Sequence, residues 1–185
     1  GSDYLTGGLG ADVLEGGTET APGNDTLIGG LSPDDTTDTG EEWIHGRLGN
    51  DVIYGNNGQD HLYGDEGDDS LYAFAYSNFA DNYVDSLYGG SGNDSFYLEA
   101  KDVVAENAGE GTDTIYVGSA YTLPANVENL TLVGTAAMDG TGNTLNNTLT
   151  GNGGLNRLYG VAGDDTLFGG AGADTLVGGA GNDTY

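Results

Sequence analysis

A nine-residue period is the feature of this sequence that most constrains its fold. Three consecutive units occupy residues 46–54, 55–63 and 64–72, and each reads Gly-x-x-Gly-x-Asp followed by three residues with a large apolar side chain in the middle. The same unit returns over residues 160–185, where the last copy stops within the unit. A fixed short period of this kind indicates a solenoid, in which successive repeats stack on one another.

Each unit predicts a tight turn followed by a short strand. Six Gly-rich residues can turn sharply, because glycine adopts positive φ without steric cost, and three residues are too few for a helix. In a three-residue strand the middle side chain points one way and its neighbours the other. We therefore expect Ile53, Leu62 and Leu71 to face one interior. Their neighbours should face outward: Val52, Tyr54, His61, Tyr63, Ser70 and Tyr72. Two units would close one coil of eighteen residues, and stacked coils would form two parallel sheets with strands about 4.7–4.9 Å apart.

Apolar burial alone does not hold such a coil together. About two large side chains per coil contribute roughly 1.5–3 kcal/mol each, whereas ordering the backbone costs on the order of 1–2 kcal/mol per residue. The coil would also place each Asp over the Asp two units further on, and like charges repel. A divalent cation would remove both difficulties. Ca²⁺ suits such turns better than Mg²⁺, because it accepts about six to eight carboxylate and carbonyl oxygens in a flexible geometry.

The repeat resembles the RTX (repeats-in-toxin) hemolysin-type calcium-binding nonapeptide, Gly-Gly-x-Gly-x-Asp-x-U-x, where U is a large apolar residue. The resemblance implies a right-handed parallel β-helix, the β-roll, with Ca²⁺ bound between each turn and the turn two units on. It implies that the earlier turn supplies the carbonyls of its second and fourth residues together with its Asp. The later turn would supply the carbonyls of its first and third residues together with its own Asp.

The resemblance assigns two complete sets of metal ligands in this sequence. One set is Arg47, Gly49, Asp51, Gly64, Glu66 and Asp69, and the other is Val161, Gly163, Asp165, Gly178, Ala180 and Asp183. It assigns further ligands in the remaining turns: Asp3, Asp12, Asp25, Glu42, Asn56, Gly58, Asp60, Asp85, Gly89, Ser91, Asp94, Gly169, Ala171 and Asp174. Glu42 stands where Asp is expected, with a side chain one methylene longer. Asn147 and Asn156 take the acid slot of their units, and we expect those turns to stack by hydrogen bonding or to bind Ca²⁺ weakly.

The repeats fall into two blocks, residues 1–97 and residues 143–185, each predicted to form a β-roll. The first block carries loop insertions at residues 18–22, 31–39 and 73–84. Residues 98–142 depart from the period and are predicted to continue the β-helix as a metal-poor connector. Its expected strands lie at residues 101–106, 111–117, 121–124 and 127–133. Because the last unit is incomplete, we expect the chain to be part of a longer protein with neighbouring domains.

Two insertions and one row of side chains leave alternatives open. The 31–39 segment holds Asp34, Asp35 and Asp38, which indicate either a solvated acidic loop or an extra Ca²⁺ site or binding loop. The 73–84 segment indicates either a lid packed on one flank of the roll or a ligand surface, because it carries four aromatic residues: Phe74, Tyr76, Phe79 and Tyr83. The outward tyrosines of the repeats indicate either cross-strand stacking or a sugar-binding stripe: Tyr54, Tyr63, Tyr72, Tyr88, Tyr97 and Tyr159.

The charge of the chain excludes several classes of partner. The 185 residues include 30 acidic and only 3 basic ones, which gives a formal net charge of −27. Nucleic acid is not an expected partner, because phosphate binding needs Lys and Arg, and an anionic membrane surface is not one either. No run of about 18 apolar residues could insert across a bilayer. A chain this acidic and Gly-rich would otherwise be disordered, so we expect it to be unfolded without Ca²⁺ and folded with it.

The sequence contains no recognisable catalytic motif. It has no cysteine and no Gly-x-Ser-x-Gly or His-Glu-x-x-His motif, and we interpret His45 and His61 as exposed residues of one sheet. We therefore predict a non-enzymatic module that folds on Ca²⁺ binding after export and stabilises or spaces a neighbouring domain. The resemblance implies a bacterial exoprotein, secreted by a type I route to the outside or the cell surface. The alternatives are an adhesin or a surface- or carbohydrate-binding region that uses the inserted loops, and a part of a secreted enzyme such as a protease, lipase or epimerase.

Overall fold

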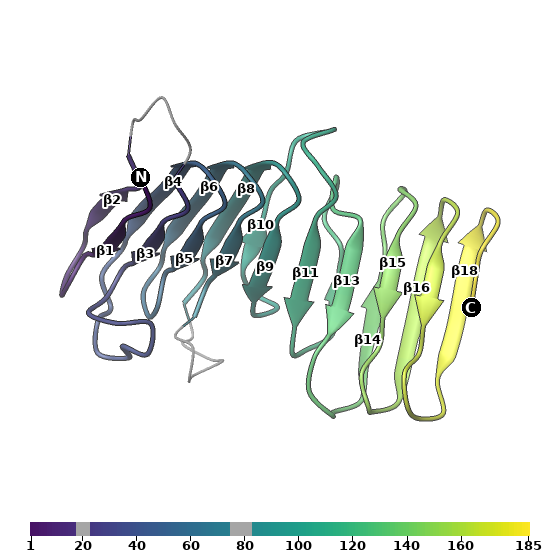
Figure 1. Ribbon diagram of the computed structural model, residues 1–185. Helices are drawn as coiled ribbons and strands as arrows, with labels where there is room; N and C mark the ends of the chain where they lie inside the picture. Colours follow the sequence, from purple (N-terminus) through teal and green to yellow (C-terminus); the bar gives the residue numbers. More distant parts are fainter. Residues whose placement is uncertain (18–22, 75–82) are drawn as a thin grey trace. The chain divides into compact units, whose positions relative to one another are not determined.

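The computed structural model describes residues 1–17, 23–74 and 83–185 (Figure 1). Every regular element in these ranges is a β-strand, and the strands pair in parallel. Contacts divide the chain into two compact units, residues 1–111 (unit 1) and residues 112–185 (unit 2), and each is a parallel β-solenoid. The predicted all-β, parallel β-roll fold is therefore confirmed. No helix in the described ranges is long and apolar enough to cross a membrane.

Unit 1 consists of two parallel sheets between which successive strands alternate. One sheet contains β1 (Tyr4–Thr6), β3 (Thr26–Ile28), β5 (Val52–Tyr54), β7 (Ser70–Tyr72) and β9 (Ser95–Leu98). The other contains β2 (Val13–Glu15), β4 (Trp43–Leu48), β6 (His61–Glu66), β8 (Ser86–Ser91) and β10 (Val103–Val104). The chain therefore passes from sheet to sheet at every turn, which is the path that the nine-residue unit predicts.

Unit 2 has the same construction. One sheet contains β11 (Thr114–Val117), β13 (Asn129–Leu132), β15 (Thr148–Thr150) and β17 (Thr166–Phe168). The other contains β12 (Tyr121–Thr122), β14 (Met138–Thr141), β16 (Asn156–Ala162) and β18 (Thr175–Ala180). The solenoid therefore includes residues that depart from the repeat, since β10 belongs to unit 1 and β11 to β14 belong to unit 2. The division into two metal-binding blocks and a metal-poor connector stays a prediction.

Neighbouring strands carry equivalent positions of successive coils. Ile53 of β5 pairs with Leu71 of β7, so one coil takes eighteen residues, as the sequence predicts. Leu62 of β6 pairs with Leu87 of β8. The 73–84 insertion therefore lengthens that coil without changing the register of the inward side chains.

The middle apolar residue of most strands lies in the core of its unit. In unit 1 these side chains have no exposed surface: Leu27, Ile44, Ile53, Leu62, Leu71, Leu87 and Phe96. Unit 2 has its own column of inward side chains without exposed surface: Ile115, Leu130, Leu149, Leu158 and Leu167. In β14 the inward position is Gly140, where the side chains of Leu130 and Leu158 fill the space that a larger residue would need.

Aromatic side chains stack along the outer faces of both sheets of unit 1. On one face Tyr72 lies between Tyr54 and Tyr97, with ring centroids 4.6 and 4.2 Å apart. On the other face His45, Tyr63 and Tyr88 form a row with centroid distances of 4.3 and 4.7 Å. The predicted cross-strand stacking is present at these tyrosines. In unit 2 the register instead places Tyr159 beside Val177.

The inserted segments are only partly covered by the described ranges. Residues 18–22 and 75–82 lie outside them, and these include Tyr76 and Phe79. At the borders of the second gap, Phe74 is buried and Tyr83 is exposed. The lid and ligand-surface interpretations of the 73–84 segment therefore stay predictions.

Candidate metal centres

The turns of successive units share one backbone conformation. Their second and fourth residues adopt positive φ, for example 79° at Arg47 and 132° at Gly49. Glycine tolerates this region, whereas it costs other residues about 1–2 kcal/mol. Four second positions nonetheless carry another residue: Arg47, Asn56, Asp65 and Val161. The turn conformation is therefore kept against local preference, as is common where the surroundings fix a functional backbone.

The acidic residue of each turn forms a hydrogen bond with the acidic residue of a neighbouring coil. The main-chain N–H of Asp51 donates to Asp69 Oδ1 at 2.7 Å, and that of Asp69 donates to Asp94 Oδ1 at 2.8 Å. The row continues toward the N-terminus, since Asp3 N–H donates to Asp25 Oδ1 and Asp25 N–H to Asp51 Oδ1, both at 2.7 Å. These five residues form the first acid ladder.

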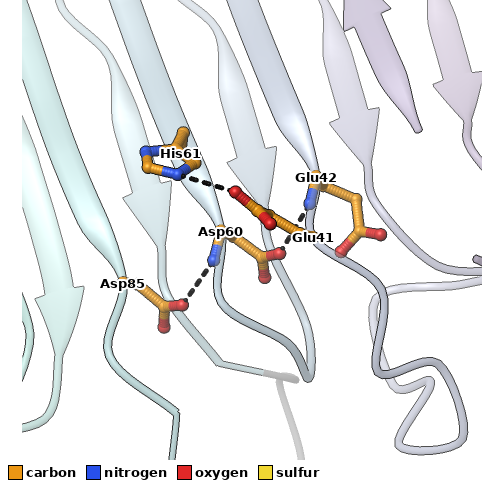
Figure 2. A network of polar contacts seen from close by, with 5 residues as sticks. All are labelled: Glu41, Glu42, Asp60, His61 and Asp85. Carbon is orange, nitrogen blue, oxygen red and sulfur yellow. Dashed lines mark hydrogen bonds and ion pairs between the residues drawn. The ribbon is translucent and has the colours of Figure 1, made fainter. Parts of the chain in front are cut away.

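A second acid ladder follows the other set of turns in unit 1 (Figure 2). Glu42 N–H donates to Asp60 Oδ1 at 3.0 Å, and Asp60 N–H donates to Asp85 Oδ1 at 2.8 Å. Asp12 precedes them in the row, because the strands that directly follow Asp12 and Glu42 pair residue for residue. Glu42 thus occupies the slot in which the repeat predicts an Asp.

Unit 2 carries shorter rows of the same kind. Asn147 N–H donates to Asp165 Oδ1 at 2.8 Å, and Asp165 N–H donates to Asp183 Oδ1 at 3.1 Å. On the other side, Asn156 N–H donates to Asp174 Oδ1 at 3.0 Å. Every residue assigned as a ligand in the acid slot therefore lies in a row with its counterpart two units away.

The second carboxylate oxygen of each rung lies beside the first glycine of its own unit. A Cβ atom at Gly46 would contact Asp51 Oδ2, and it would lie 2.7 Å from the carbonyl oxygen of Gly64 in the next coil. Likewise, a Cβ atom at Gly64 would contact Asp69 Oδ2, and it would lie 2.5 Å from the carbonyl oxygen of Gly89. A carboxylate oxygen and a main-chain carbonyl oxygen thus converge in the space that each first glycine leaves free. In unit 2 the same convergence involves Gly160, Asp165 Oδ2 and the Gly178 carbonyl.

Most of these second oxygens are buried acceptors that receive no hydrogen bond. They are both carboxylate oxygens of Glu42 and the Oδ2 atoms of Asp12, Asp51, Asp60, Asp69 and Asp165. Leaving a buried acceptor unpaired costs about 1–3 kcal/mol, and more when it is charged. Two converging oxygens without a donor are unfavourable unless a cation lies between them. Carboxylate and carbonyl oxygens are the ligands that Ca²⁺ prefers, so the residues present fit that ion.

The turns that were assigned to one ion are neighbours in the sheet. Arg47 pairs with Asp65. Two residues further along the chain, the Gly49 N–H donates to the Glu66 carbonyl oxygen at 2.9 Å. In unit 2, Gly163 N–H donates to the Ala180 carbonyl at 2.9 Å. The register also places Val161 beside the turn that begins at Gly178. The remaining assigned carbonyl donors lie in the corresponding turns: Asn56, Gly58, Gly89, Ser91, Gly169 and Ala171. Their role as ligands stays a prediction.

Burial raises the pKa values of the ladder carboxyl groups. The pKa rises to about 7 at Asp69 and to about 6 at Asp51 and Glu42, chiefly because burial disfavours the charged form. Neighbouring negative charges add to these shifts, as Asp94 and Asp51 do at Asp69. Burial, with Glu42 beside it, also raises the pKa of Asp60. Without a cation, the folded turns therefore favour protonated acids.

We expect the metal-free chain to gain β-structure on acidification. A carboxyl group whose pKa is higher in the folded state binds more protons when folded, so stability falls as the pH rises through the folded-state pKa. For Asp69 the window runs from its ordinary pKa of 3.8 to about 7. Far-UV circular dichroism in metal-free buffer should therefore show more β-structure at a pH of about 5 than at a pH of about 7.

A matched pair of variants isolates the ladder contribution to this pH dependence. Asp69→Asn should reduce the gain on acidification, because the buried titrating group is lost. Asp68→Asn makes the same chemical change at an exposed neighbour and should leave the gain unchanged. A β-sheet signal of the wild-type chain that falls on acidification would contradict the assignment.

Asn side chains close several turns of unit 2 by direct hydrogen bonds. Asn147 Nδ2 donates to the Glu128 carbonyl at 3.1 Å, and Asn156 Nδ2 donates to the Met138 carbonyl at 2.9 Å. Asn143 Nδ2 donates to the Val127 carbonyl at 2.7 Å. In these turns an amide N–H group meets the carbonyl oxygens, and this is the hydrogen-bonded alternative predicted for Asn147 and Asn156.

The sequence reasoning misses further carboxylates of the rows, among them those of Asp102 and Glu128. Asp102 Oδ1 accepts from the Asp85 N–H at 3.2 Å and extends the second acid ladder. In unit 2, Glu128 Oε2 accepts from the Asp113 N–H at 2.9 Å. Both residues lie where the glycines of the repeat are absent. The signal that remains is an acid two residues before an inward apolar residue, Val104 or Leu130.

Side chains alone do not gather into a metal site. Within the described ranges no three Asp, Glu, His or Cys side chains are grouped to hold an ion by themselves, so main-chain carbonyls have to complete any site. The two histidines belong to the sheet surface. His45 Nδ1 lies 3.1 Å from Asp65 Oδ2, and His61 Nε2 lies 3.3 Å from Glu41 Oε1 (Figure 2).

These features define a class of cation-binding repeat proteins. Its members are parallel solenoids in which each repeat has a glycine turn, a buried carboxylate and a converging carbonyl. The family model described as the RTX calcium-binding nonapeptide repeat (4 copies) matches residues 1–20, 36–71, 79–100, 141–176 and 150–185. These ranges cover more than half of the chain, and the chain belongs to the RTX calcium-binding nonapeptide repeat family. No curated protein matches the chain.

Proposed function

We propose that the chain is a Ca²⁺-dependent, non-enzymatic β-roll module of a longer secreted protein, which folds after export and stabilises or spaces a neighbouring domain. The observation that carries the proposal is the recurrent convergence of a buried, unpaired carboxylate oxygen on a carbonyl oxygen of the next coil, as at Asp51 and Gly64. No donor in the described chain satisfies these carboxylate oxygens. A hard cation that binds several oxygens at once would satisfy them.

The proposed roles of the residues follow from their positions in the turns. Ca²⁺ supplies a double positive charge to which about six to eight oxygens can be attached. In the central site Asp51 and Asp69 would provide carboxylate oxygens, and the turns at residues 47–49 and 64–66 would provide carbonyl oxygens. The first acid ladder holds these two carboxylates in place, because Asp51 Oδ1 and Asp69 Oδ1 each accept a main-chain N–H, while their Oδ2 atoms receive no hydrogen bond and are left for the ion.

Coupling of binding to folding supports the export-related part of the proposal. The ligands of one site come from two coils, so the site does not exist in the unfolded chain and the binding free energy becomes folding free energy. Extracellular Ca²⁺ modules have dissociation constants of about 10⁻⁴–10⁻³ M, which a cytosol poor in free Ca²⁺ does not reach. The chain would then stay unfolded inside the cell and fold outside.

Direct binding measurements test this function. We expect isothermal titration calorimetry to detect several Ca²⁺ ions per chain and no comparable binding of Mg²⁺. Asp69→Asn should weaken Ca²⁺ binding at the ladder by about tenfold or more, because even the outer-shell partners of metal ligands contribute about 10–100-fold. Asp68→Asn, its exposed neighbour, should bind as the wild type does. Equal effects of the two variants, or equal binding of Mg²⁺, would rule out the proposed sites.

A further inference from the structure

The 31–39 insertion of unit 1 is folded around its own acidic residues. Asp35 accepts hydrogen bonds from Leu31 N–H at 2.9 Å and from the Thr37 hydroxyl at 2.7 Å, which closes the loop on itself. With its amide oriented to satisfy both neighbours, Asn56 donates to the Pro33 carbonyl at 3.2 Å. The insertion is thereby attached to the next coil, and it has a defined conformation in which its acids differ in environment.

Asp38 is the most deeply buried acid of the insertion. It is 3% exposed, whereas Asp34 of the same loop is exposed. Its Oδ1 accepts from Gly10 N–H at 3.0 Å and from Gly40 N–H at 3.1 Å. Asp38 therefore bridges the turns of two coils, and its Oδ2 is buried without a hydrogen-bond partner.

Glu42 reaches the same place from the turn of the later coil. It has no exposed surface, and neither of its carboxylate oxygens receives a hydrogen bond. A Cβ atom at Gly40 would contact Glu42 Oε1 and would lie 2.5 Å from the carbonyl oxygen of Gly10. The carboxylates of Asp38 and Glu42, which both have unpaired oxygens, thus gather around Gly40 together with the Gly10 carbonyl.

We propose that Asp38 is an additional Ca²⁺ ligand from outside the nonapeptide, completing with Glu42 and the Gly10 carbonyl a cation position that the insertion modifies. This inference rests on the proposed Ca²⁺-binding function and deepens it. The insertion replaces the single third residue of a regular unit, and the acid slot holds Glu in place of Asp. With a second buried carboxylate, this position carries more negative charge than a ladder position that has a single carboxylate. Ligand charge is a main determinant of Ca²⁺ affinity.

Trp43 provides a selective reporter for this position. It is the only tryptophan of the chain and directly follows Glu42, so Tb³⁺ bound there as a Ca²⁺ substitute should be sensitised by tryptophan excitation. The 12 tyrosines of the chain sensitise Tb³⁺ at the other turns. We expect Asp38→Asn, which keeps the shape and the Oδ1 acceptor, to raise the tryptophan-sensitised Tb³⁺ midpoint by about tenfold or more. The control Asp34→Asn should not change it, and added Ca²⁺ should displace the tryptophan-sensitised ion.

The outcomes separate this inference from the proposed function. An unchanged tryptophan-sensitised midpoint in Asp38→Asn overturns the inference, and so does tyrosine-sensitised binding without any tryptophan-sensitised binding. If neither signal appears, the proposed function itself fails. A measurement on the wild-type chain avoids any folding defect of the variant. When La³⁺ replaces Ca²⁺ in the folded, Ca²⁺-loaded chain, the carboxyl ¹³C resonances of Asp38 and Glu42 should shift in one step while that of Asp34 stays. An Asp38 resonance that does not move with Glu42 contradicts the assignment.

Discussion

Chelation of Ca²⁺ at neutral pH is expected to abolish most of the β-structure of unit 1. Without the ion, the first acid ladder places the buried carboxylates of Asp51 and Asp69 beside main-chain carbonyl oxygens and in one row with each other. An uncompensated buried charge costs about 3–5 kcal/mol, and domains are stable by only about 5–15 kcal/mol in total. A few such rungs therefore outweigh the stability of the coils. Far-UV circular dichroism during chelation and readdition of Ca²⁺ should show a reversible, cooperative loss and recovery of β-sheet.

Unit 2 gives this prediction an internal control. The coils around β13 and β15 are closed by amide donors such as Asn143 and Asn147, so their hydrogen bonds do not depend on the ion. Hydrogen exchange in chelator should therefore retain more protection in β13 and β15 than in β5 and β7. Mg²⁺ in place of Ca²⁺ should restore little structure. A β-sheet spectrum that chelator leaves unchanged would mean that the ion is not part of the folded state.

Gly67→Ala is expected to destabilise unit 1 strongly. Gly67 adopts φ of 139°, and a Cβ atom there would overlap the carbonyl oxygen of Gly49 in the preceding coil. The left-handed conformation alone costs about 1–2 kcal/mol. Displacing the neighbouring backbone as well should bring the loss in the free energy of unfolding to about 3–5 kcal/mol. Urea denaturation in saturating Ca²⁺ measures this loss.

Gly10→Ala is the matched control for this effect. Gly10 holds the same fourth position of its unit and also has positive φ, 99°, but a Cβ atom there would meet nothing within 4 Å. Its substitution should therefore cost only the conformational term of about 1–2 kcal/mol. Equal losses for the two variants would show that coil-to-coil contact does not determine the requirement for glycine.

The regular coils could be predicted from the sequence because their two signals are local. Glycines mark the turn, and one apolar residue such as Ile53 or Leu62 marks the inward face of each three-residue strand. The strand β14 escapes this reasoning, since its inward position is Gly140 and its burial comes from leucines of the neighbouring coils. A position filled by its neighbours carries no apolar side chain of its own that would mark it as inward.

The candidate sites show the same limit. The acid slots of the repeats follow from the period, and the structure brings each acid beside its counterpart. Asp38 could be recognised only as part of an acidic loop, because its inward direction depends on the conformation that Asp35 imposes on residues 31–39. Whether Asn147 holds an ion or a hydrogen bond likewise depends on the carbonyl that faces it, and that carbonyl comes from another coil.

Packing of each coil against the next has a mechanical consequence. Eighteen residues separate Ile53 from its neighbour Leu71, and drawn out straight they would span about 60 Å. Stacked, they advance the solenoid by only about 4.8 Å. Under a pulling force on its ends, unit 1 would therefore keep its length as long as its coils stay folded. Each coil that unfolded would lengthen the chain by more than ten times the rise of that coil. The ion occupancy of a turn would then set how far apart the module holds whatever is attached to it.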